Sequence, residues 1–353
     1  MQPTRARRGL IVAVAPVVAL SILAACSDDG SDAGAETIPA STTATTVPLP
    51  IATSPVGEND TSFPVDVIDC DGRVTTYEQA PQRVVALDEA MAENLIQLGF
   101  RDAIVGVARY QTDDALWPLT RDEVLSRQIV NDGSTAPTME AVERVAPDLV
   151  VASGSDTMDA VATRDDWTAA GIHTFVPRTG CDAPTADADG LTMFYDDYTQ
   201  LGLMFDAQLH SQKIIAQVQA HVDQMAGELA RVDAQQATVW VYGGADVVFD
   251  RTTPVDSMLR AVGLTVVGGD GAVDADTVAE ANPDLIWIIT PRGADPDEAA
   301  AALEAELAAD PALADLRAVT SSSFVVTPAD QVSPTPRMTD GLQQVVDALI
   351  AMA

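Results

Sequence analysis

The sequence contains very little positive charge. Its 353 residues include 53 Asp and Glu against 19 Lys and Arg, and Lys213 is the one lysine. A surface with this excess of acid repels nucleic acid and offers no basic patch to an anionic membrane. The composition therefore argues against nucleic acid as a partner and against attachment to a membrane through basic residues.

Sequence motifs of common enzyme classes are also missing. There is no G-x-S-x-G, no G-x-x-x-x-G-K-[ST], no G-x-G-x-x-G after a strand and no H-E-x-x-H. Only His173, His210 and His221 are present, and the last two lie 11 residues apart on one expected helix, about three turns, so they cannot bind the same metal ion. We therefore expect neither an enzyme nor a protein with a metal ion or cofactor of its own.

The N-terminal segment is typical of a bacterial lipoprotein signal. Three arginines precede an apolar run over 9–22, which is shorter than the roughly 20 residues of a membrane span. Leu23-Ala24-Ala25-Cys26 follows and resembles the lipobox, whose cysteine is lipidated and becomes the new N-terminus. We expect residues 1–26 to be the signal peptide and Cys26 to carry the lipid. The alternative is an ordinary signal peptide with a chance cysteine.

The next segment, 27–62, is rich in Ser, Thr, Ala, Pro and acidic residues and shows no helical or strand periodicity. Such a composition cannot bury a core, so we expect a disordered spacer between the lipid and the folded part. Beyond it the chain has two more cysteines, Cys70 and Cys181. In an oxidising compartment a single pair of cysteines indicates one disulfide, the alternative being two unrelated free thiols.

Short apolar runs alternate with amphipathic segments in two blocks of the remaining sequence. In the first block the pattern predicts strands at 83–87, 103–107, 148–152 and 173–176, and helices over 90–98, 138–146 and 159–170. In the second block it predicts strands at 238–242, 284–289 and 324–326, and helices over 254–262, 273–281 and 339–352. Strands separated by helices of about 10–15 residues are typical of βαβ units and parallel sheets.

A longer helical stretch over 188–231 separates the two blocks. Its apolar residues, among them Ile214, Val218 and Leu229, recur on one helical face. Each block also contains a helix followed by Pro-Asp-Leu and a buried strand, at 138–151 and at 276–287. The two blocks therefore look like structural counterparts on either side of a central helix.

The order and spacing of several short motifs resemble the siderophore- and cobalamin-type substrate-binding proteins of ABC importers, the periplasmic binding proteins of class III. The matching pieces are Pro81-Gln-Arg-Val-Val-Ala-Leu, Leu98-Gly99 with Ile104-Val-Gly-Val, Pro147-Asp-Leu, Pro283-Asp-Leu, Leu201-Gly202 with Phe205, Cys70-Asp-Gly-Arg and Gly180-Cys181. The resemblance covers 65–353. It implies an α/β fold of two Rossmann-like lobes with parallel sheets, bridged by one long rigid helix, with the ligand bound in the cleft between the lobes.

This resemblance also implies a domain organisation and a location. We expect a first lobe over 63–187, a bridging helix over 188–232 and a second lobe over 233–353. The protein would be a lipid-anchored monomer that faces outside the cytoplasm, at the cell surface or in the periplasm. Its expected partners are a small-molecule iron chelate and the permease of an ABC importer.

The implied function is capture of a ferric siderophore for that importer, with cobalamin, haem or a sensor or surface module without a transporter as alternatives. The family's cobalamin binders place tryptophan near positions that hold Ser153 and Asp270 here, which argues against cobalamin. Haem needs a His or Tyr axial ligand, and Tyr110 and Tyr242 keep that alternative open.

The expected cleft residues are aromatic and arginine side chains at the ends of predicted strands. Aromatic rings supply flat apolar contact, and arginine supplies paired donors for hydroxamate, catecholate or carboxylate oxygens. Surface ion pairs are the alternative role for each arginine. The candidates are Arg109, Tyr110, Trp117, Tyr242, Arg251, Arg292 and Arg337.

The resemblance further implies two acidic residues that dock on the permease, one at the tip of each lobe, where permease arginines pair with them. These positions fall at Asp159 and Asp276, although the family usually has glutamate there. The alternative is that both are ordinary acidic residues at helix starts, where negative charge is favourable.

Overall fold

The computed structural model describes residues 61–110, 116–131, 133, 135–181, 189–244, 252–268, 273–291 and 295–353. The predicted signal peptide, Cys26 and the spacer up to residue 60 lie outside these ranges. The end of the predicted spacer is attached to the fold, because the N–H of Thr61 donates to Asp206 Oδ1 at 2.8 Å. No helix in the described part of the chain has the length and apolarity that a membrane crossing requires.

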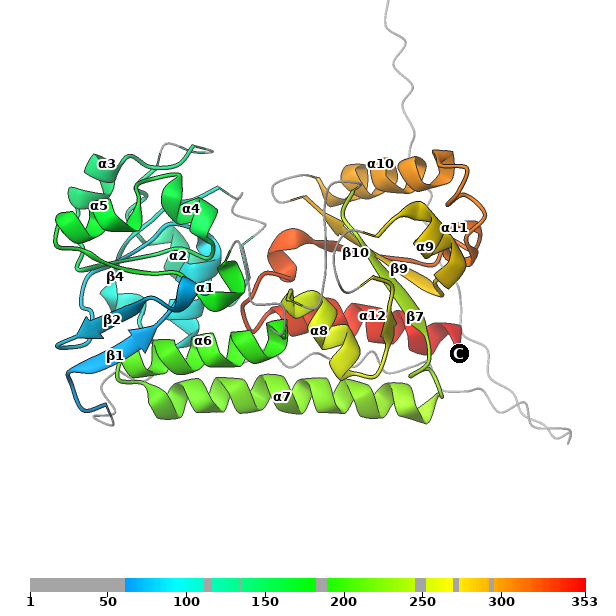
Figure 1. Ribbon diagram of the computed structural model, residues 1–353, viewed down its shortest axis with the longest axis horizontal. Coiled ribbons are helices and arrows are strands. Elements are labelled where there is room, and N and C mark those ends of the chain that lie inside the picture. Colours follow the sequence, from blue (N-terminus) through cyan, green and yellow to red (C-terminus); the bar gives the residue numbers. More distant parts are fainter. Residues whose placement is uncertain are drawn as a thin grey trace, which may run out of the picture. The chain divides into compact units, whose positions relative to one another are not determined.

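Four parallel strands form the first sheet (Figure 1). They are β3 (Val84–Ala86), β4 (Ile104–Val107), β5 (Leu149–Val151) and β6 (His173–Phe175), in the order β4-β3-β5-β6. Successive side chains of a strand point to opposite faces, so Val84 and Ala86 join one core cluster and Val85 joins another. Both faces are covered, which explains why these strands are almost wholly apolar.

Helices lie on both faces of this sheet. They are α1 (Glu89–Gln97), α2 (Arg121–Leu125), α3 (Met139–Glu143), α4 (Ser155–Asp159) and α5 (Arg164–Ala169). Short 3-10 helices occur at Cys70–Gly72, Arg101–Ala103, Arg178–Gly180 and Ala329–Gln331. As predicted, α3 begins after Thr138, whose side chain accepts the N–H of Ala141, and the helix ends before Pro147.

The helix predicted over 159–170 corresponds to α5 alone, so its predicted start was wrong. α4 ends at Asp159 and α5 begins after Thr163. The Thr163 hydroxyl accepts the N–H of Asp166, and the Asp166 carboxylate accepts the N–H of Thr163, each at 3.2 Å. This reciprocal capping box starts a new helix. Periodicity concealed the break because Met158 and Trp167 face the same core cluster.

An antiparallel hairpin that the sequence analysis did not predict precedes the first sheet. Its strands are β1 (Val65–Ile68) and β2 (Val74–Tyr77). Cys70 lies between them and forms a disulfide with Cys181, with Cα atoms 5.4 Å apart. The N–H of Cys70 also donates to the carbonyl of Val176 at 2.9 Å. The covalent bond therefore joins the hairpin to the segment that follows β6.

The bridging helix predicted over 188–232 consists of two helices, α6 (Gly190–Met204) and α7 (Gln208–Arg231). The break lies at Asp206, whose φ of +58° is left-handed and cannot continue a right-handed helix. α6 packs on α7, and Gly202 permits the close approach because a Cβ there would lie 2.7 Å from Ser211 Cβ. α7 is the long helix that runs along both sheets in Figure 1.

The second sheet repeats the parallel arrangement of the first. Its strands are β7 (Thr238–Tyr242), β8 (Thr265–Val266), β9 (Leu285–Thr290) and β10 (Phe324–Pro328), in the order β10-β9-β7-β8. Its helices are α8 (Pro254–Ala261), α9 (Ala275–Ala281), α10 (Pro296–Ala309), α11 (Arg317–Thr320) and α12 (Met338–Met352). The strand β8 and the helices α2, α10 and α11 were not predicted from the sequence.

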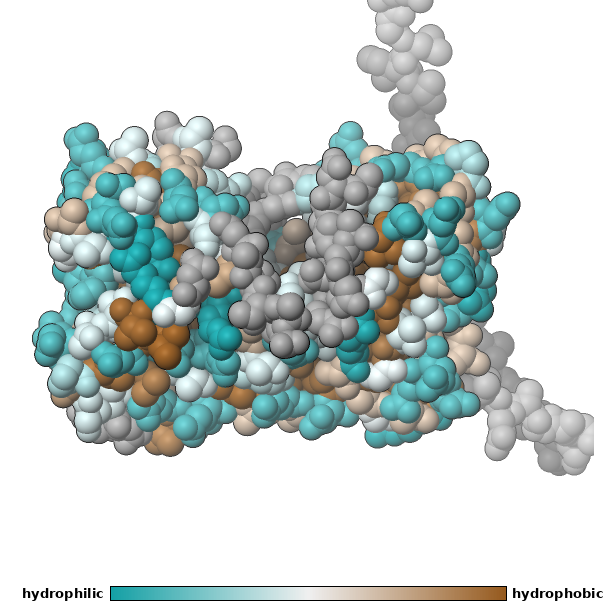
Figure 2. Space-filling view, in the orientation of Figure 1, coloured by the Kyte–Doolittle hydropathy of each residue, from teal (hydrophilic) through white to brown (hydrophobic). Residues whose placement is uncertain are grey.

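One buried apolar cluster extends from the first sheet through α6, α7 and α12 to the second sheet. The described residues from 61 to 353 accordingly form one compact unit. Trp287 is fully buried in β9 and donates from Nε1 to Thr327 Oγ1 at 2.8 Å, which confirms its predicted place in the core. Hydrophilic residues cover much of the described surface in Figure 2.

Candidate ligand-binding site

The carboxyl ends of the first sheet's strands meet at one edge, where βα loops build ligand sites in folds of this kind. Asp88, directly after β3, is buried and joins two of these loops. Its Oδ1 accepts the N–H of Met91 at 2.9 Å and so caps α1, while its Oδ2 accepts the N–H of Ser153 at 2.6 Å, after β5. The side chain thus fixes the β5 loop against the start of α1.

Two further buried acids on α1 hold the segment that follows β4. Glu89 accepts the N–H of Tyr110. Glu93, one turn later, accepts the N–H of Trp117 through Oε1 at 3.1 Å. Both candidate aromatic residues are therefore held through their backbone by carboxylates of one helix.

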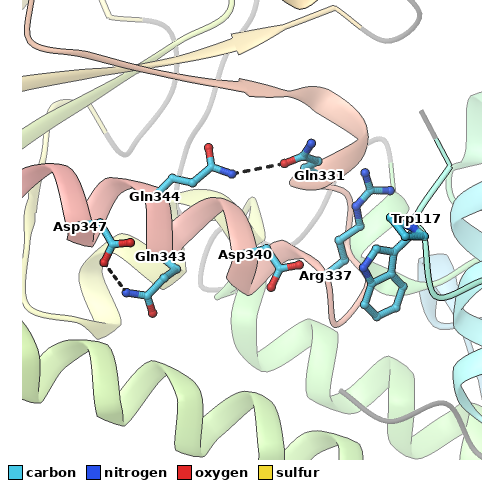
Figure 3. A pocket seen from close by; sticks show the side chains of 8 residues that line it. Trp117, Gln331, Arg337, Asp340, Gln343, Gln344 and Asp347 are labelled. Carbon is cyan, nitrogen blue, oxygen red and sulfur yellow. Dashed lines mark hydrogen bonds between the residues drawn. The ribbon is translucent and has the colours of Figure 1, made fainter. Parts of the chain in front are cut away.

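A pocket of about 350 Å³ opens beside α12 (Figure 3). Trp117 and Pro118 line it from the first lobe, and the second lobe supplies two carboxylates, three amides and one guanidinium. This volume lies within the range of small-molecule sites. The six residues from the second lobe are Gln331, Arg337, Asp340, Gln343, Gln344 and Asp347.

Hydrogen bonds within the pocket wall orient its amides, as Figure 3 shows. Gln343 donates to Asp347 at 2.8 Å and Gln344 donates to Gln331 at 3.4 Å. Burial raises the pKa of Asp340, although His221 and Arg337 act in the opposite direction. The pocket is therefore polar along α12 and aromatic at the end formed by Trp117.

Arg337 points toward Trp117 in Figure 3, but its guanidinium already pairs with two carboxylates. Nη2 lies 2.7 Å from Asp330 Oδ2 and Nη1 lies 3.6 Å from Glu93 Oε1. The three side chains are only 4–9% exposed. Since Glu93 belongs to α1 and the other two to the second lobe, this ion-pair cluster joins the two lobes directly beneath the pocket.

The structure brings together some of the predicted ligand residues and separates others. Trp117 and Arg337 line the pocket. Arg109 and Tyr110 lie at the end of β4, where Asn131 bonds both backbone polar groups of Arg109. Tyr110 is half-buried, and burial, with Asp88 and Glu89 nearby, raises its pKa.

Tyr242 lies on the other side of the second sheet. Alternation along β7 places Val241 in the central cluster and Tyr242 in the cluster under α10, beside Trp240 and Leu303. Burial and the Glu306 carboxylate raise the pKa of the Tyr242 hydroxyl. Arg251 and Arg292 lie outside the described residues.

Sequence reasoning missed the buried acids Asp88, Glu89 and Glu93, because carboxylates are so numerous in this chain that none stood out. A usable signal was present in the sequence, since the other residues of α1 are mostly apolar, and the structure shows the whole helix to be buried. Acidic side chains in so buried a helix require partners. The acids Asp340 and Asp347 on the polar face of α12 were also missed, because carboxylates are too numerous in this chain for any of them to stand out.

The predicted docking acids are both exposed. Asp276 lies in the first turn of α9, as expected. Asp159 is the last residue of α4 and not at a helix start, because α4 begins four residues earlier and Asp156 occupies its first turn. Hydrogen bonds from the side chain and N–H of Thr277 lower the pKa of Asp274, which caps α9.

A second, smaller pocket of about 140 Å³ includes Tyr77, Asp148 and His173. It lies where β5 and β6 begin, at the amino end of the first sheet. Ligands in open α/β folds bind at the carboxyl ends of strands. This geometry favours the pocket beside α12 as the ligand site.

Comparisons with known proteins agree with the geometry. A model of the family named periplasmic binding protein matches residues 84–331. A cobalamin-binding protein from Halobacterium salinarum is 23% identical over 310 residues, which cover 85% of this chain and 78% of that protein.

Two solved structures share the fold at 21% sequence identity. A periplasmic binding protein from Veillonella parvula has a TM-score of 0.67 and covers 80% of this chain and 98% of its own. A protein of an ABC-type Fe3+-hydroxamate transport system from Saccharomonospora viridis has a TM-score of 0.66 and covers 81% and 99%. The predicted two-lobed α/β fold with parallel sheets is thereby confirmed. The chain therefore belongs to the periplasmic binding protein family, whose members are extracytoplasmic substrate-binding proteins of ABC importers and not enzymes.

Proposed function

We propose that this protein captures a ferric siderophore in the pocket beside α12 and delivers it to the permease of an ABC importer. One observation carries the proposal: the pocket combines an aromatic wall, Trp117, with a row of amide and acid groups on α12. Such a site suits a flat or compact chelate that presents both apolar and hydrogen-bonding surface. The similar protein from S. viridis belongs to a system named for Fe3+-hydroxamate, which supports the same cargo.

Cobalamin is the second candidate, because the relative from H. salinarum is named for it. One residue of the first lobe disfavours cobalamin as the ligand. Ser153 lies near the position where the family's cobalamin binders have tryptophan, and its N–H donates to Asp88 Oδ2. We therefore rank cobalamin below a ferric siderophore.

The proposal includes attachment to the membrane through Cys26, which would hold the protein at the outer face as a monomer. Its support is the lipobox sequence and the composition of the spacer. An anchored binding protein stays close to its permease without a membrane span of its own.

Ligand titration tests the cargo. The mature chain with Cys26→Ser is titrated with ferric hydroxamates, ferric catecholates, ferric citrate, cobalamin and haem while tryptophan fluorescence is recorded. We expect sub-micromolar binding of one ferric class with quenching of Trp117, because the coloured chelate lies against the indole. Trp117→Phe should remove most of the quenching, and Trp117→Ala should weaken binding about tenfold, a cost in the range of a lost aromatic contact.

Tyr242→Phe is the matched control, because that ring faces α10 and not the pocket. Its affinity should equal that of the unchanged chain. If only cobalamin or haem bound, the ligand would be that compound and not a ferric siderophore. Failure of every compound to bind, confirmed by calorimetry, would contradict the proposal.

Docking on the permease is tested by charge reversal. We propose that Asp159 and Asp276 contact permease arginines, since both are exposed and belong to different lobes. The double variant Asp159→Lys/Asp276→Lys should reduce ligand uptake by cells at least tenfold while ligand affinity in solution is unchanged. The control is Asp297→Lys/Glu140→Lys, which reverses acids on α10 and α3. Normal uptake by the Asp159/Asp276 variant would exclude these two residues as docking groups.

A further inference from the structure

The ion-pair cluster beneath the pocket has more buried negative charge than positive charge. Arg337 faces two carboxylates, Asp330 at 2.7 Å and Glu93 at 3.6 Å. Glu93 is the more distant partner and also lies near Glu89, one turn earlier on α1. When two carboxylates share one cation in a buried place, one of them readily takes up a proton near neutral pH.

Glu93 also connects three parts of the molecule. It lies on α1 in the first lobe, its carboxylate accepts the N–H of Trp117 in the pocket wall, and it pairs with Arg337 in the second lobe. Asn94, the next residue, donates to the carbonyl of Pro334 at 3.1 Å and accepts from the Tyr198 hydroxyl at 2.6 Å. A change in the charge of Glu93 therefore acts on the pocket wall and on the contact between the lobes together.

We propose that Glu93 is a proton-linked positioning residue, whose ionised form ties Trp117 to Arg337 across the two lobes and whose protonated form releases that tie and weakens ligand binding. This inference rests on the proposed function, because the pocket must be the ligand site. It adds a regulation: the affinity for the ligand depends on external pH.

The charged groups around Glu93 set the direction of the effect. Burial raises its pKa to about 7, while Arg337 and the N–H of Trp117 lower it and Asp330 and Glu89 raise it. Asp340 on α12 interacts with Arg337 and with His221 of α7, and the buried Tyr198 hydroxyl of α6 interacts with Glu93. Below pH 7 a neutral Glu93 no longer forms an ion pair with Arg337, so α1 loses this charged contact with the second lobe.

Ligand binding should shift the protonation equilibrium of Glu93. A chelate seated against Trp117 is held best when both lobes form the pocket, so the bound state favours the ionised carboxylate. Affinity should therefore rise as pH increases from about 5.5 to about 8, by tenfold for each unit by which binding lowers the Glu93 pKa. Binding near pH 7 should release up to one proton.

The first experiment needs no ligand. The mature chain with Cys26→Ser is labelled with ¹³C at glutamate side-chain carboxyls, and the Glu93 signal is assigned by its loss in Glu93→Gln. We expect that carboxyl to titrate between about pH 6 and 8. In Asp330→Asn its midpoint should fall by about one unit, because Arg337 is then no longer shared.

The second experiment measures affinity from pH 5.5 to 8.5 by calorimetry in buffers of different ionisation enthalpy. Glu93→Gln should give a nearly pH-independent affinity at the weaker, acid level and no proton release. Asp330→Asn should move the pH-dependent step to lower pH. Glu140→Gln on α3, whose side chain is 88% exposed, is the control and should behave like the unchanged chain.

These outcomes separate the two proposals. A Glu93 carboxyl that titrates near pH 4, or a Glu93→Gln variant with an unaltered affinity profile, would overturn the proton linkage and leave the ligand assignment intact. Near-neutral titration of Glu93 with no binding of any ferric complex would overturn the proposed function. A Glu93 titration midpoint that moves to higher pH in Asp330→Asn would also contradict the inference. The proposed role predicts a lower midpoint, and a merely structural role predicts no change.

Discussion

Replacement of both Cys70 and Cys181 by serine is expected to lower the free energy of unfolding by roughly 4–5 kcal/mol. The disulfide closes a loop whose ends are 111 residues apart in sequence. A cross-link over so long a loop removes much of the entropy of the unfolded chain, and the chain-entropy model assigns a stabilisation of this size. The loop contains all four strands of the first sheet, so we expect that lobe to be destabilised most.

Urea unfolding of the mature chain measures this effect. The reference is Cys26→Ser, which removes the remaining thiol and leaves the disulfide. Addition of a reducing agent should lower the stability of the reference to that of the Cys70→Ser/Cys181→Ser variant and leave the variant unchanged. A loss below about 1 kcal/mol, or two free thiols in the unreduced reference, would contradict the prediction.

Substitution of Arg337 by methionine should cost about 3–5 kcal/mol at pH 8. Removing the guanidinium leaves Glu93 and Asp330 buried without their cation, and one uncompensated partner of a buried ion pair is strongly destabilising. The loss should shrink as pH falls, because protonation of Glu93 removes part of the buried charge. Arg337 lowers the pKa of Glu93, so its removal leaves that pKa still further above the unfolded value. The folded variant then holds more protons than the unfolded state and loses stability as pH rises.

Arg317→Met is the matched control for this substitution. Arg317 also pairs with a carboxylate, Asp284 at 2.9 Å, but its side chain is 56% exposed. Exposed pairs contribute about 0–1 kcal/mol, so the control should lose little. The triple variant Arg337→Met/Glu93→Gln/Asp330→Asn should recover part of the loss. Equal effects of the Arg337 and Arg317 substitutions at pH 8 would show that burial of the cluster contributes nothing.

Most strands and longer helices could be predicted because their signals are local. The apolar runs of β5 and β9 begin at Pro-Asp-Leu motifs and are bounded by helices. Composition alone therefore predicted that both faces of these strands are buried. Two predicted helix boundaries were wrong because a local feature interrupts a continuous pattern. The Thr163 capping box divides α4 from α5, and the left-handed backbone at Asp206 divides α6 from α7.

The candidate site was less predictable because its chemistry depends on partners far apart in sequence. Trp117 and Arg337 were identified by residue type, yet Arg337 pairs with two carboxylates, one of which, Glu93, is 244 residues away in sequence. Tyr242 has the right residue type at the right strand end, but one step of strand alternation places it under α10. Residue type and strand position thus reduced the number of candidate ligand-binding residues, but they did not show which of these residues line the pocket.

The parallel α/β class, the two-block organisation and the class of ligand-binding protein follow from composition, periodicity and motif order. Which acids are buried, which arginine is paired and which aromatic ring lines the pocket became evident from the three-dimensional arrangement. Periodicity indicates whether a side chain is buried, whereas its charge state and role depend on the groups that long-range folding places around it.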